Sequence, residues 1–189
     1  MTYPFSSRTY SPSSIALHWL MGLAIATTFC LGLYMVELSL SPDKLRYYSW
    51  HKWIGVSLFL FAGLRLALRL TTPATRRPAG YSLQMKLAEW AHRIFYVLMF
   101  AIPISGWLMS SAKGVSTVYF GLWQLPDLVT RDAALGRNLQ WLHVTLNFSM
   151  AAIVVGHAAA ALKHHFIDRD DVLARMLPCL RVRPPREPS

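Results

Sequence analysis

The stretch LQWLHVTLNFSMAAIVVGHAAAAL, residues 139–162, decides the fold of this protein. It contains no Lys, Arg, Asp or Glu, and it carries two histidines, His143 and His157. An α-helix needs about 20 predominantly apolar residues to cross the hydrocarbon core of a bilayer. The stretch therefore predicts a membrane-spanning helix that brings two ionisable side chains into the membrane.

Three further apolar runs precede this one. Residues 15–36 are 22 residues without a charge, which at about 1.5 Å per residue reach about 33 Å. Residues 53–70 are interrupted by Arg65 and Arg69, whose stems can reach one headgroup layer. Residues 94–112 are again uncharged, so we predict an all-α integral membrane four-helix bundle. The expected helices cover residues 13–37, 50–70, 87–111 and 138–165.

The composition of the whole chain excludes several other classes of protein. Of 189 residues, 54% are hydrophobic and 15% charged, which fits a soluble or disordered chain badly. The net charge of +10 would suggest nucleic-acid binding in a soluble protein, but these charges lie at the ends of apolar runs. Two cysteines, Cys30 and Cys179, cannot form a dense disulfide framework.

Local signals refine the four runs. The first run could be a secretory signal, but it is too long for one and lacks a cleavage site of small residues. Pro103 and Gly106 predict a kink in the third helix. Residues 42–48 and the Pro126-Asp127 pair predict turns in two loops, at about 37–50 and 113–138. Residues 1–177 would form one transmembrane domain, followed by a basic Pro/Arg-rich tail, 178–189.

The basic residues divide unevenly between the two ends of the bundle. Of the 19 Lys and Arg residues, six lie in the loops at 37–50 and 113–138 or beside them, and thirteen lie on the other side. Since cytoplasmic loops carry the excess of Lys and Arg, both termini are expected in the cytoplasm. The thirteen are Arg8, Arg65, Arg69, Arg76, Arg77, Lys86, Arg93, Lys163, Arg169, Arg175, Arg181, Arg183 and Arg186.

Histidines are the chemically informative residues of the spans. An ionisable group is costly inside a membrane, and five of the seven histidines lie in the spans or at their mouths. His143 and His157 are 14 residues apart, about 21 Å along one helix, and face nearly the same way. We therefore pair His157 with His18 on the cytoplasmic side and His143 with His51 on the outer side.

Two neutral imidazoles on opposed helices suit the axial positions of a haem iron in a four-helix bundle. No Cys-x-x-Cys-His sequence occurs, so such a haem would be of the b type, held without a covalent bond. Gly22 and Gly55, four residues after His18 and His51, would leave room for the macrocycle. A histidine that only bridges helices, and glycines that only let helices pack, are the alternatives.

Several motifs of the chain resemble the bacterial cytochrome b561 family, from about Ser13 to Leu177. The motifs are Leu17-His18-Trp19, Trp50-His51-Lys52 with Gly55, Gly63-Leu64-Arg65-Leu66, Ala91-His92-Arg93, Pro103-Ile104-Ser105-Gly106, Leu142-His143, and the closing run from Gly156-His157 through Lys163-His164-His165-Phe166 to Asp170-Asp171. The resemblance implies a four-helix membrane protein of the inner membrane with two haem b groups. Its ligands would be His18, His51, His143 and His157.

Other residues are weaker candidates for the site. Arg65 and Arg69 could pair with haem propionates, since a guanidinium binds a carboxylate with two hydrogen bonds, or could simply reach the headgroups. His92 could hold a propionate, join a proton path or bridge two helices. His164 is expected to contact a quinone, with Lys163 and His165 beside it as anchors or a proton route. Asp168, Asp170 and Asp171 form a solvated cap or a weak metal site.

Four basic residues at the outer end, Lys52, Lys113, Arg131 and Arg137, could steer a small anion, although charged loops need no such role. The resemblance implies electron transfer between quinone and a redox partner. Its most concrete form is superoxide:ubiquinone oxidoreductase. The alternatives are an electron-transfer subunit for a periplasmic dehydrogenase, hydrogenase or carrier protein, and a histidine-lined transporter of metal ions or protons.

Overall fold

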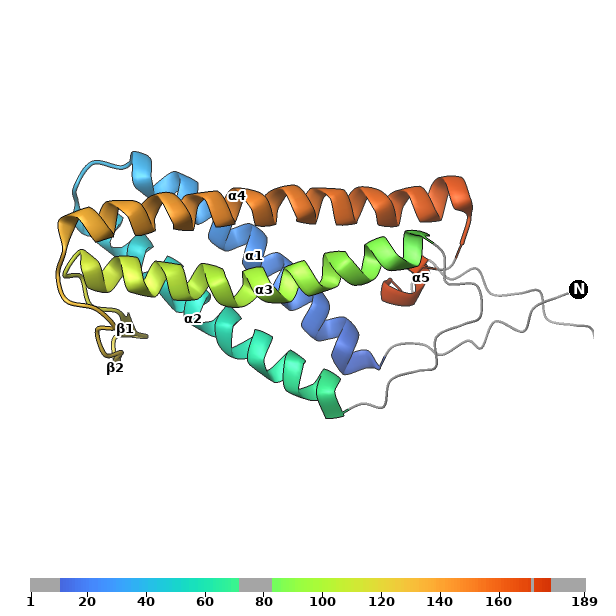
Figure 1. Cartoon of the computed structure of the whole chain (residues 1–189), viewed down its shortest axis with the longest axis horizontal. Coiled ribbons are helices and arrows are strands. Elements are labelled where there is room, and N and C mark those ends of the chain that lie inside the picture. Colours follow the sequence, from blue (N-terminus) through green and yellow to red (C-terminus); the bar gives the residue numbers. More distant parts are fainter. Residues whose placement is uncertain (1–10, 72–82, 171, 178–189) are drawn as a thin grey trace, which may run out of the picture.

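The computed structural model describes residues 11–71, 83–170 and 172–177, and within these ranges the chain is mostly helical. Figure 1 shows the long helices packed into a bundle, with short elements at its two ends. The long helices are α1 (Pro12–Glu37), α2 (Pro42–Thr71), α3 (Leu83–Ala112) and α4 (Ala133–Lys163). Each is long and apolar enough to cross a membrane. The four predicted helices are therefore present.

Polar side chains fix where the long helices begin. The Ser11 hydroxyl accepts a hydrogen bond from the backbone N–H of Ser14 at 3.2 Å, and Pro12 occupies the first turn of α1. One oxygen of the Asp132 carboxylate accepts from the N–H groups of Ala134 and Leu135, at 2.8 and 3.0 Å. These caps satisfy N–H groups that have no partner within the helix.

The prediction of a turn at residues 42–48 was wrong, because these residues form the first two turns of α2. The Ser41 hydroxyl accepts from the backbone N–H of Lys44 at 3.2 Å, and the Ser41 carbonyl accepts from Leu45. Pro42 is compatible with a first helical turn, and Asp43 places a carboxylate near the positive end of the helix dipole. The loop between α1 and α2 is thus much shorter than expected.

Apolar side chains of all four long helices meet in one core. Met21 of α1, Leu58 of α2, Leu98 and Met99 of α3 and Met150 of α4 are all buried. Helix α3 packs most extensively against α4, and α1 packs against α2. The third helix continues through Pro103, where sequence predicted a kink.

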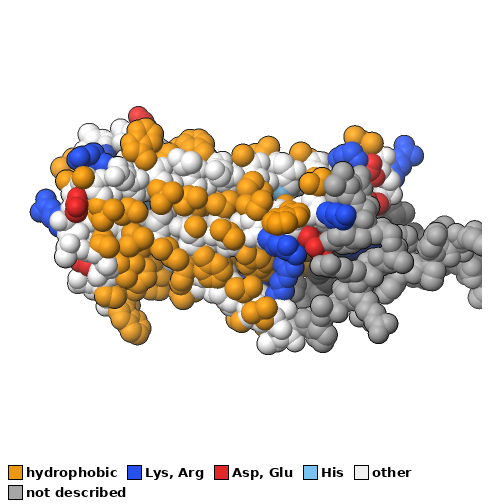
Figure 2. Space-filling view, in the orientation of Figure 1, with side chains coloured by type: hydrophobic (Ala, Val, Ile, Leu, Met, Phe, Trp, Pro, Cys, Tyr) orange, Lys and Arg blue, Asp and Glu red, His pale blue; other side chains and the backbone are white. Residues whose placement is uncertain are grey.

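The outer surface of the bundle is apolar along most of its length. Figure 2 shows hydrophobic side chains over the middle of the bundle and Lys, Arg, Asp and Glu side chains near its two ends. Leu23, Leu64, Val97 and Val155 are each more than half exposed. Such a surface is typical of helices that face lipid rather than water.

The segment between α3 and α4 holds a small β-hairpin that sequence did not predict. Strand β1 (Val118–Tyr119) pairs antiparallel with β2 (Trp123–Gln124). Helix α4 begins at Ala133, so the predicted loop 113–138 ends several residues early. The backbone N–H of Asp132 donates to the carbonyl of Ala112 at 2.9 Å, which joins the start of α4 to the end of α3.

At the other end of the bundle, α4 gives way to a π-helical turn, η1 (His164–Asp168), and then to the short helix α5 (Val172–Met176). The expected end of this helix, at residue 165, thus falls inside η1. The indole N–H of Trp19 donates to the carbonyl of Met176 at 2.9 Å. The beginning of α1 and the end of α4 therefore lie at the same end of the bundle. The predicted tail, 178–189, lies outside the described residues.

Candidate functional site

Two imidazoles face each other at the end of the bundle near the hairpin. The ring centroids of His51 on α2 and His143 on α4 are 6.3 Å apart, and the ring planes are nearly perpendicular, at 76°. Both histidines are partly buried. The structure thus brings together the two residues that sequence paired on the outer side, which we call the outer pair.

Each histidine of the outer pair is held through its Nδ1 atom. His51 Nδ1 lies 3.1 Å from the carbonyl oxygen of Thr28 on α1. His143 Nδ1 lies 3.1 Å from the carbonyl oxygen of Ile102 and 3.0 Å from the hydroxyl of Ser105, both on α3. A carbonyl oxygen can only accept, so Nδ1 is the protonated nitrogen in each ring. The lone pair is then on Nε2, where a metal ion would bind.

Glycines allow the neighbouring helices to approach the outer pair. A Cβ atom at Gly32 of α1 would lie 3.2 Å from Cε1 of His51, and one at Gly106 of α3 would lie 3.0 Å from Cε1 of His143. Both contacts would be tighter than ordinary packing allows. Gly32 and Gly106 are thus the glycines that contact the histidines, and the open space predicted beside Gly22 and Gly55 is compatible with the structure. A Cβ at Gly22 or Gly55 would meet no other atom within 4 Å.

A second group of histidines lies toward the end of the bundle that carries α5. His18 on α1 faces His157 on α4 with ring centroids 6.2 Å apart, which we call the inner pair. His92 on α3 also faces His157, at 5.8 Å, and its Nδ1 lies 2.7 Å from the carbonyl oxygen of Ala88 in its own helix. His157 therefore has two imidazole neighbours, only one of which sequence paired with it.

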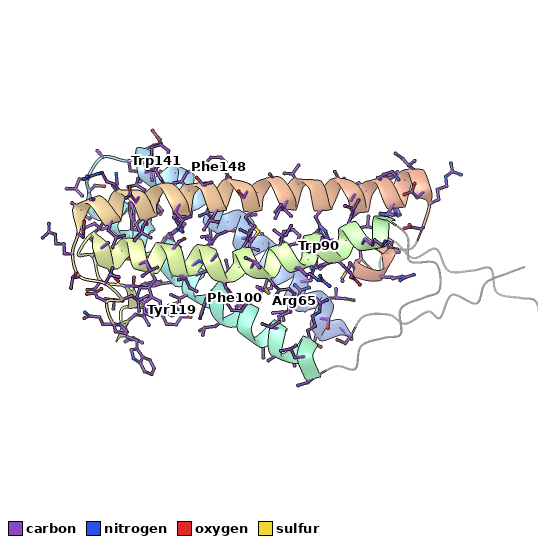
Figure 3. All side chains as sticks on the ribbon, viewed as in Figure 1. Arg65, Trp90, Phe100, Tyr119, Trp141 and Phe148 are labelled. Carbon is purple, nitrogen blue, oxygen red and sulfur yellow. The ribbon has the colours of Figure 1, made fainter. Side chains whose placement is uncertain are left out.

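The two arginines of α2 are placed differently with respect to the inner pair. Arg65 is partly buried, and its charge lies close enough to act electrostatically on His18, His92 and His157. Figure 3 places Arg65 in the half of the bundle that ends at α5. The guanidinium of Arg69 lies over the ring of Tyr96, 5.5 Å from its centroid, in a cation–π contact. The charge of Arg65 thus acts on all three histidines, whereas that of Arg69 acts on His92.

The spacing of the two pairs fits a metal ion between two axial imidazoles. Metal–imidazole bonds of about 2 Å place each ring centroid about 3.1 Å from the ion, so two opposed rings are about 6.2 Å apart. The observed separations are 6.3 Å in the outer pair and 6.2 Å in the inner pair. The Thr28 hydroxyl, on the residue that holds His51, is buried without a hydrogen-bond partner. The described residues therefore fit a metal-containing group held between the two imidazoles of each pair.

Basic residues at the end of the bundle near the hairpin are engaged to different degrees. The Lys52 ammonium donates to the carbonyls of Val115 and Ser116, at 3.2 and 3.3 Å, and so holds the segment before the hairpin. Lys113 donates to the side-chain oxygen of Gln140 at 2.6 Å, and partial burial lowers its pKa from the usual 10.5. Arg137 is exposed on the first turns of α4.

Arg131, the fourth basic residue of this group, packs its aliphatic stem against Gly114, whose backbone has the positive φ of 70°. A Cβ at Gly114 would lie 3.1 Å from Cδ of Arg131. Lys52, Lys113 and Arg131 therefore have structural contacts besides their charge. Lys113 and Arg137 are both exposed to solvent.

The turn η1 gathers an acidic and basic cluster at the inner end. His164 Nδ1 lies 2.7 Å from Oδ2 of Asp170 and 3.2 Å from Oδ2 of Asp168, and the Lys163 ammonium donates to Asp168 at 2.6 Å. His165 instead packs its ring against Phe166, with centroids 4.8 Å apart. The third acidic residue of the predicted set, Asp171, lies outside the described residues.

Sequence inspection missed the residues that orient the histidines. Thr28 and Ile102 act through backbone carbonyls, which no side-chain pattern can reveal. Ser105 and Gly106 did stand in a motif quoted for the family resemblance, but without an assigned role. A serine and a glycine in an apolar span were the available signal, because small residues mark close helix contacts in membranes.

Paired imidazoles inside a bundle of membrane-length helices are typical of membrane cytochromes of the b type. The profile described as "Prokaryotic cytochrome b561" matches residues 9–179, and the chain therefore belongs to the prokaryotic cytochrome b561 family. It is an integral membrane redox cytochrome of bacteria that transfers electrons. Membership implies that it binds haem b, and the two imidazole pairs fit that group.

Relatives cover nearly the whole chain. "Cytochrome b561 homolog 2" of Escherichia coli (strain K12) is 36% identical over 185 residues, which is 94% of this chain and 95% of the relative. "Probable superoxide oxidase CybB" of Yersinia pestis is 30% identical over 180 residues, 90% of this chain and 97% of the relative. "Cytochrome b561 homolog 1" of Escherichia coli (strain K12) is 27% identical over 172 residues, 89% and 97% respectively.

Proposed function

We propose that this protein is a di-haem b oxidoreductase of the bacterial inner membrane that oxidises superoxide at its outer end and reduces ubiquinone. The proposal rests mainly on the two imidazole pairs, which share α4 and lie toward opposite ends of the bundle. Residues 1–177 would form the cytochrome unit, with 178–189 as a cytoplasmic tail. Two redox centres at two depths would let electrons cross a bilayer that excludes ions.

The inner pair, His18 and His157, and the outer pair, His51 and His143, would each hold one haem through Nε2. A b haem with two imidazole ligands changes between the ferric and ferrous states and so carries one electron. The Nδ1 hydrogen bonds of the outer pair fix the tautomer that leaves Nε2 free to bind. Arg65 would pair with a propionate near the inner histidines, and His92, which lies beside them, would assist it.

The proposed reaction consumes two superoxide anions at the outer end for each ubiquinone that is reduced. Two superoxide anions each lose one electron and become O2. The two electrons, with two protons, convert one ubiquinone to ubiquinol. The relative from Yersinia pestis, whose printed name is "Probable superoxide oxidase CybB", supports this choice of donor. Lys113 and Arg137 at the outer end would attract the anion, with Lys52 and Arg131 adding to the positive field.

Neutralising the two exposed charges tests the superoxide proposal. The Lys113→Gln/Arg137→Gln variant should slow stopped-flow haem reduction by superoxide about three- to tenfold at low ionic strength, because steering charges raise association rates. The dependence of the rate on salt should flatten, since exposed charges are screened within about 8 Å at 0.15 M. Haem content should stay at the wild-type value.

The matched control removes two positive charges at the other end of the bundle, in the variant Arg93→Gln/Arg175→Gln. Its rate with superoxide should equal that of the wild type. Haem reduction by superoxide that is slow in the wild type, or unaffected by salt and by both variants, would contradict the proposal. Rapid exchange with quinol but none with superoxide would instead favour a cytochrome subunit for a periplasmic redox protein. Membership of a redox cytochrome family speaks against the histidine-lined transporter.

Orientation in the membrane is part of the same proposal, with both termini in the cytoplasm. It is supported by the thirteen basic residues predicted on that side against six on the other. After Arg186, a fused reporter protein that is active only in the cytoplasm should be active, and one that is active only in the periplasm should be inactive. One inserted between Asp132 and Leu135 should be active only as a periplasmic reporter. The opposite pair of results would place the inner pair on the periplasmic side.

A further inference from the structure

The hairpin between α3 and α4 has a backbone that is largely satisfied by its own hydrogen bonds. Val118 pairs with Gln124 and Tyr119 with Trp123. Within the turn, the N–H of Leu122 donates to the carbonyl of Tyr119 at 3.0 Å. Internal pairing of backbone groups is what a segment needs to leave bulk water at low cost.

Side chains of α2 hold the hairpin against the side of the bundle. The indole N–H of Trp53 donates to the carbonyl of Val118 at 2.7 Å, and the hydroxyls of Ser57 and Tyr119 lie 2.9 Å apart. The rings of Trp53 and Phe120 lie 5.1 Å apart with planes tilted by 33°. Residue 53 opens the apolar run of α2, and residue 57 is one turn deeper. The hairpin therefore lies beside the beginning of the membrane-spanning run, not above it (Figures 1 and 3).

The turn of the hairpin exposes large apolar side chains. Leu122 is 91% exposed, Trp123 75% and Phe120 55%. The hairpin stands out from the end of the bundle in Figure 1, and hydrophobic side chains protrude from the same place in Figure 2. Phe120 is partly covered by Trp53, whereas Leu122 and Trp123 are largely uncovered by the described residues. In water, a cluster of this kind would be unfavourable.

An apolar groove of about 470 Å³ continues this surface onto the helices. Phe120 of the hairpin forms one wall, and the other walls come from α1 and α2, including Leu31, Tyr47, Trp50 and Trp53. The apolar face of the hairpin is thus continuous with the lipid-facing surface of the bundle. Trp and Tyr side chains are enriched where a bilayer meets water, because their rings are apolar and their N–H or O–H groups are polar.

From these contacts we propose that the hairpin, residues 118–124, is embedded in the lipid interface of the leaflet at the His51 end of the bundle. Leu122 and Trp123 lie among the glycerol groups and upper acyl chains. Lipid, rather than a protein partner, is the occupant, because the hairpin is fastened at the level where α2 becomes apolar. The hairpin acts as a lateral anchor that sets the depth of this end of the bundle.

A fluorescent probe at the tip of the hairpin tests this placement. In a Cys30→Ala/Cys179→Ala background, Leu122→Cys is labelled with an environment-sensitive dye, and the holoprotein is placed in phosphatidylcholine nanodiscs. Doxyl groups at carbon 5 of the acyl chains should lower its emission at least about twofold, as expected of an interfacial residue. Aqueous iodide should quench it several times less than a probe at Ala134→Cys, an exposed position in the first turn of α4.

Three results separate the occupants of this surface. Quenching of the Leu122 probe by the lipid spin label, with protection from iodide, supports the proposal. Quenching by iodide to the same degree as the Ala134 probe would place the hairpin in water and overturn it. Protection from both quenchers would mean that protein, such as a second copy of the chain, covers the hairpin, and this also overturns it. Unchanged haem content in both labelled variants verifies that the bundle is intact.

Discussion

Replacing His143 with alanine should remove one b haem from the purified protein and leave the other in place. His143 contributes the α4 half of the outer pair, and its Nδ1 is already used by Ile102 and Ser105. Without this imidazole one axial position of the iron is lost, and no other described histidine lies against His51. The pyridine haemochrome assay should therefore fall from two haems per chain to about one.

His51→Ala should have the same effect as His143→Ala, and His18→Ala or His157→Ala should remove the other haem instead. Redox titration should distinguish the two kinds of variant, because each retains a different haem and therefore shows a single midpoint potential. The sites should be independent because 14 residues of α4, about 21 Å, separate the two histidines. Loss of both haems in every variant, with the protein still monodisperse, would contradict that independence.

His92 is the decisive control for the inner pair, because its ring is nearer to His157 than that of His18 is. If His18 is the ligand, His92→Ala retains two haems and His18→Ala retains one. The opposite pattern would assign His92 as the ligand and refute the pairing proposed here. His165→Ala, at a histidine that packs on Phe166, should retain both haems.

His164→Ala should slow the reoxidation of reduced haem by ubiquinone by about a hundredfold, the lower range for loss of a general acid or base. Reduction of ubiquinone needs two protons, and His164 lies partly buried at the inner end of the bundle. Its Nδ1 lies 2.7 Å from the Asp170 carboxylate, which orients the ring and leaves Nε2 for the quinone oxygen. Reduction of haem by superoxide at the outer end should be unchanged.

The variant Asp170→Asn tests whether Asp170 acts by orienting the His164 ring or only by stabilising η1. The amide retains the shape, and its oxygen can still accept a hydrogen bond from Nδ1, but without the charge that bond is weaker. We expect a severalfold slower reoxidation with wild-type haem content. His165→Ala is the matched control and should be reoxidised at the wild-type rate. Wild-type reoxidation in His164→Ala would exclude this histidine from the quinone reaction.

The helices could be predicted because bilayer thickness imposes a minimum apolar length, which hydropathy detects directly. The pairing of His143 with His51 and of His157 with His18 also followed from regular helix geometry. The start of α2 was not predicted correctly, because Ser-Pro-Asp signals both a turn and a helix N-terminus. Only the contacts of Ser41 with Lys44 and Leu45 show that the chain is helical here.

Elements stabilised by tertiary contacts escaped prediction. Each strand of the hairpin has two residues, too few for a periodic pattern, and β1 is held by hydrogen bonds with Trp53 and Ser57. The turn η1 follows a helix whose apolar pattern gives no sign of a change in winding. The orienting groups of the site are carbonyls of neighbouring helices, and their identity depends on which helices pack together.

Helix α4 supplies one histidine to each pair, whereas α1 and α2 each supply a histidine to only one pair. This arrangement restricts how α4 can change in length. An extra residue between His143 and His157 would turn one imidazole by about 100° relative to the other and move it about 1.5 Å along the axis. No shift of α4 as a rigid body could restore both pairs. Insertions and deletions should therefore be excluded from residues 143–157, because any of them would separate at least one pair.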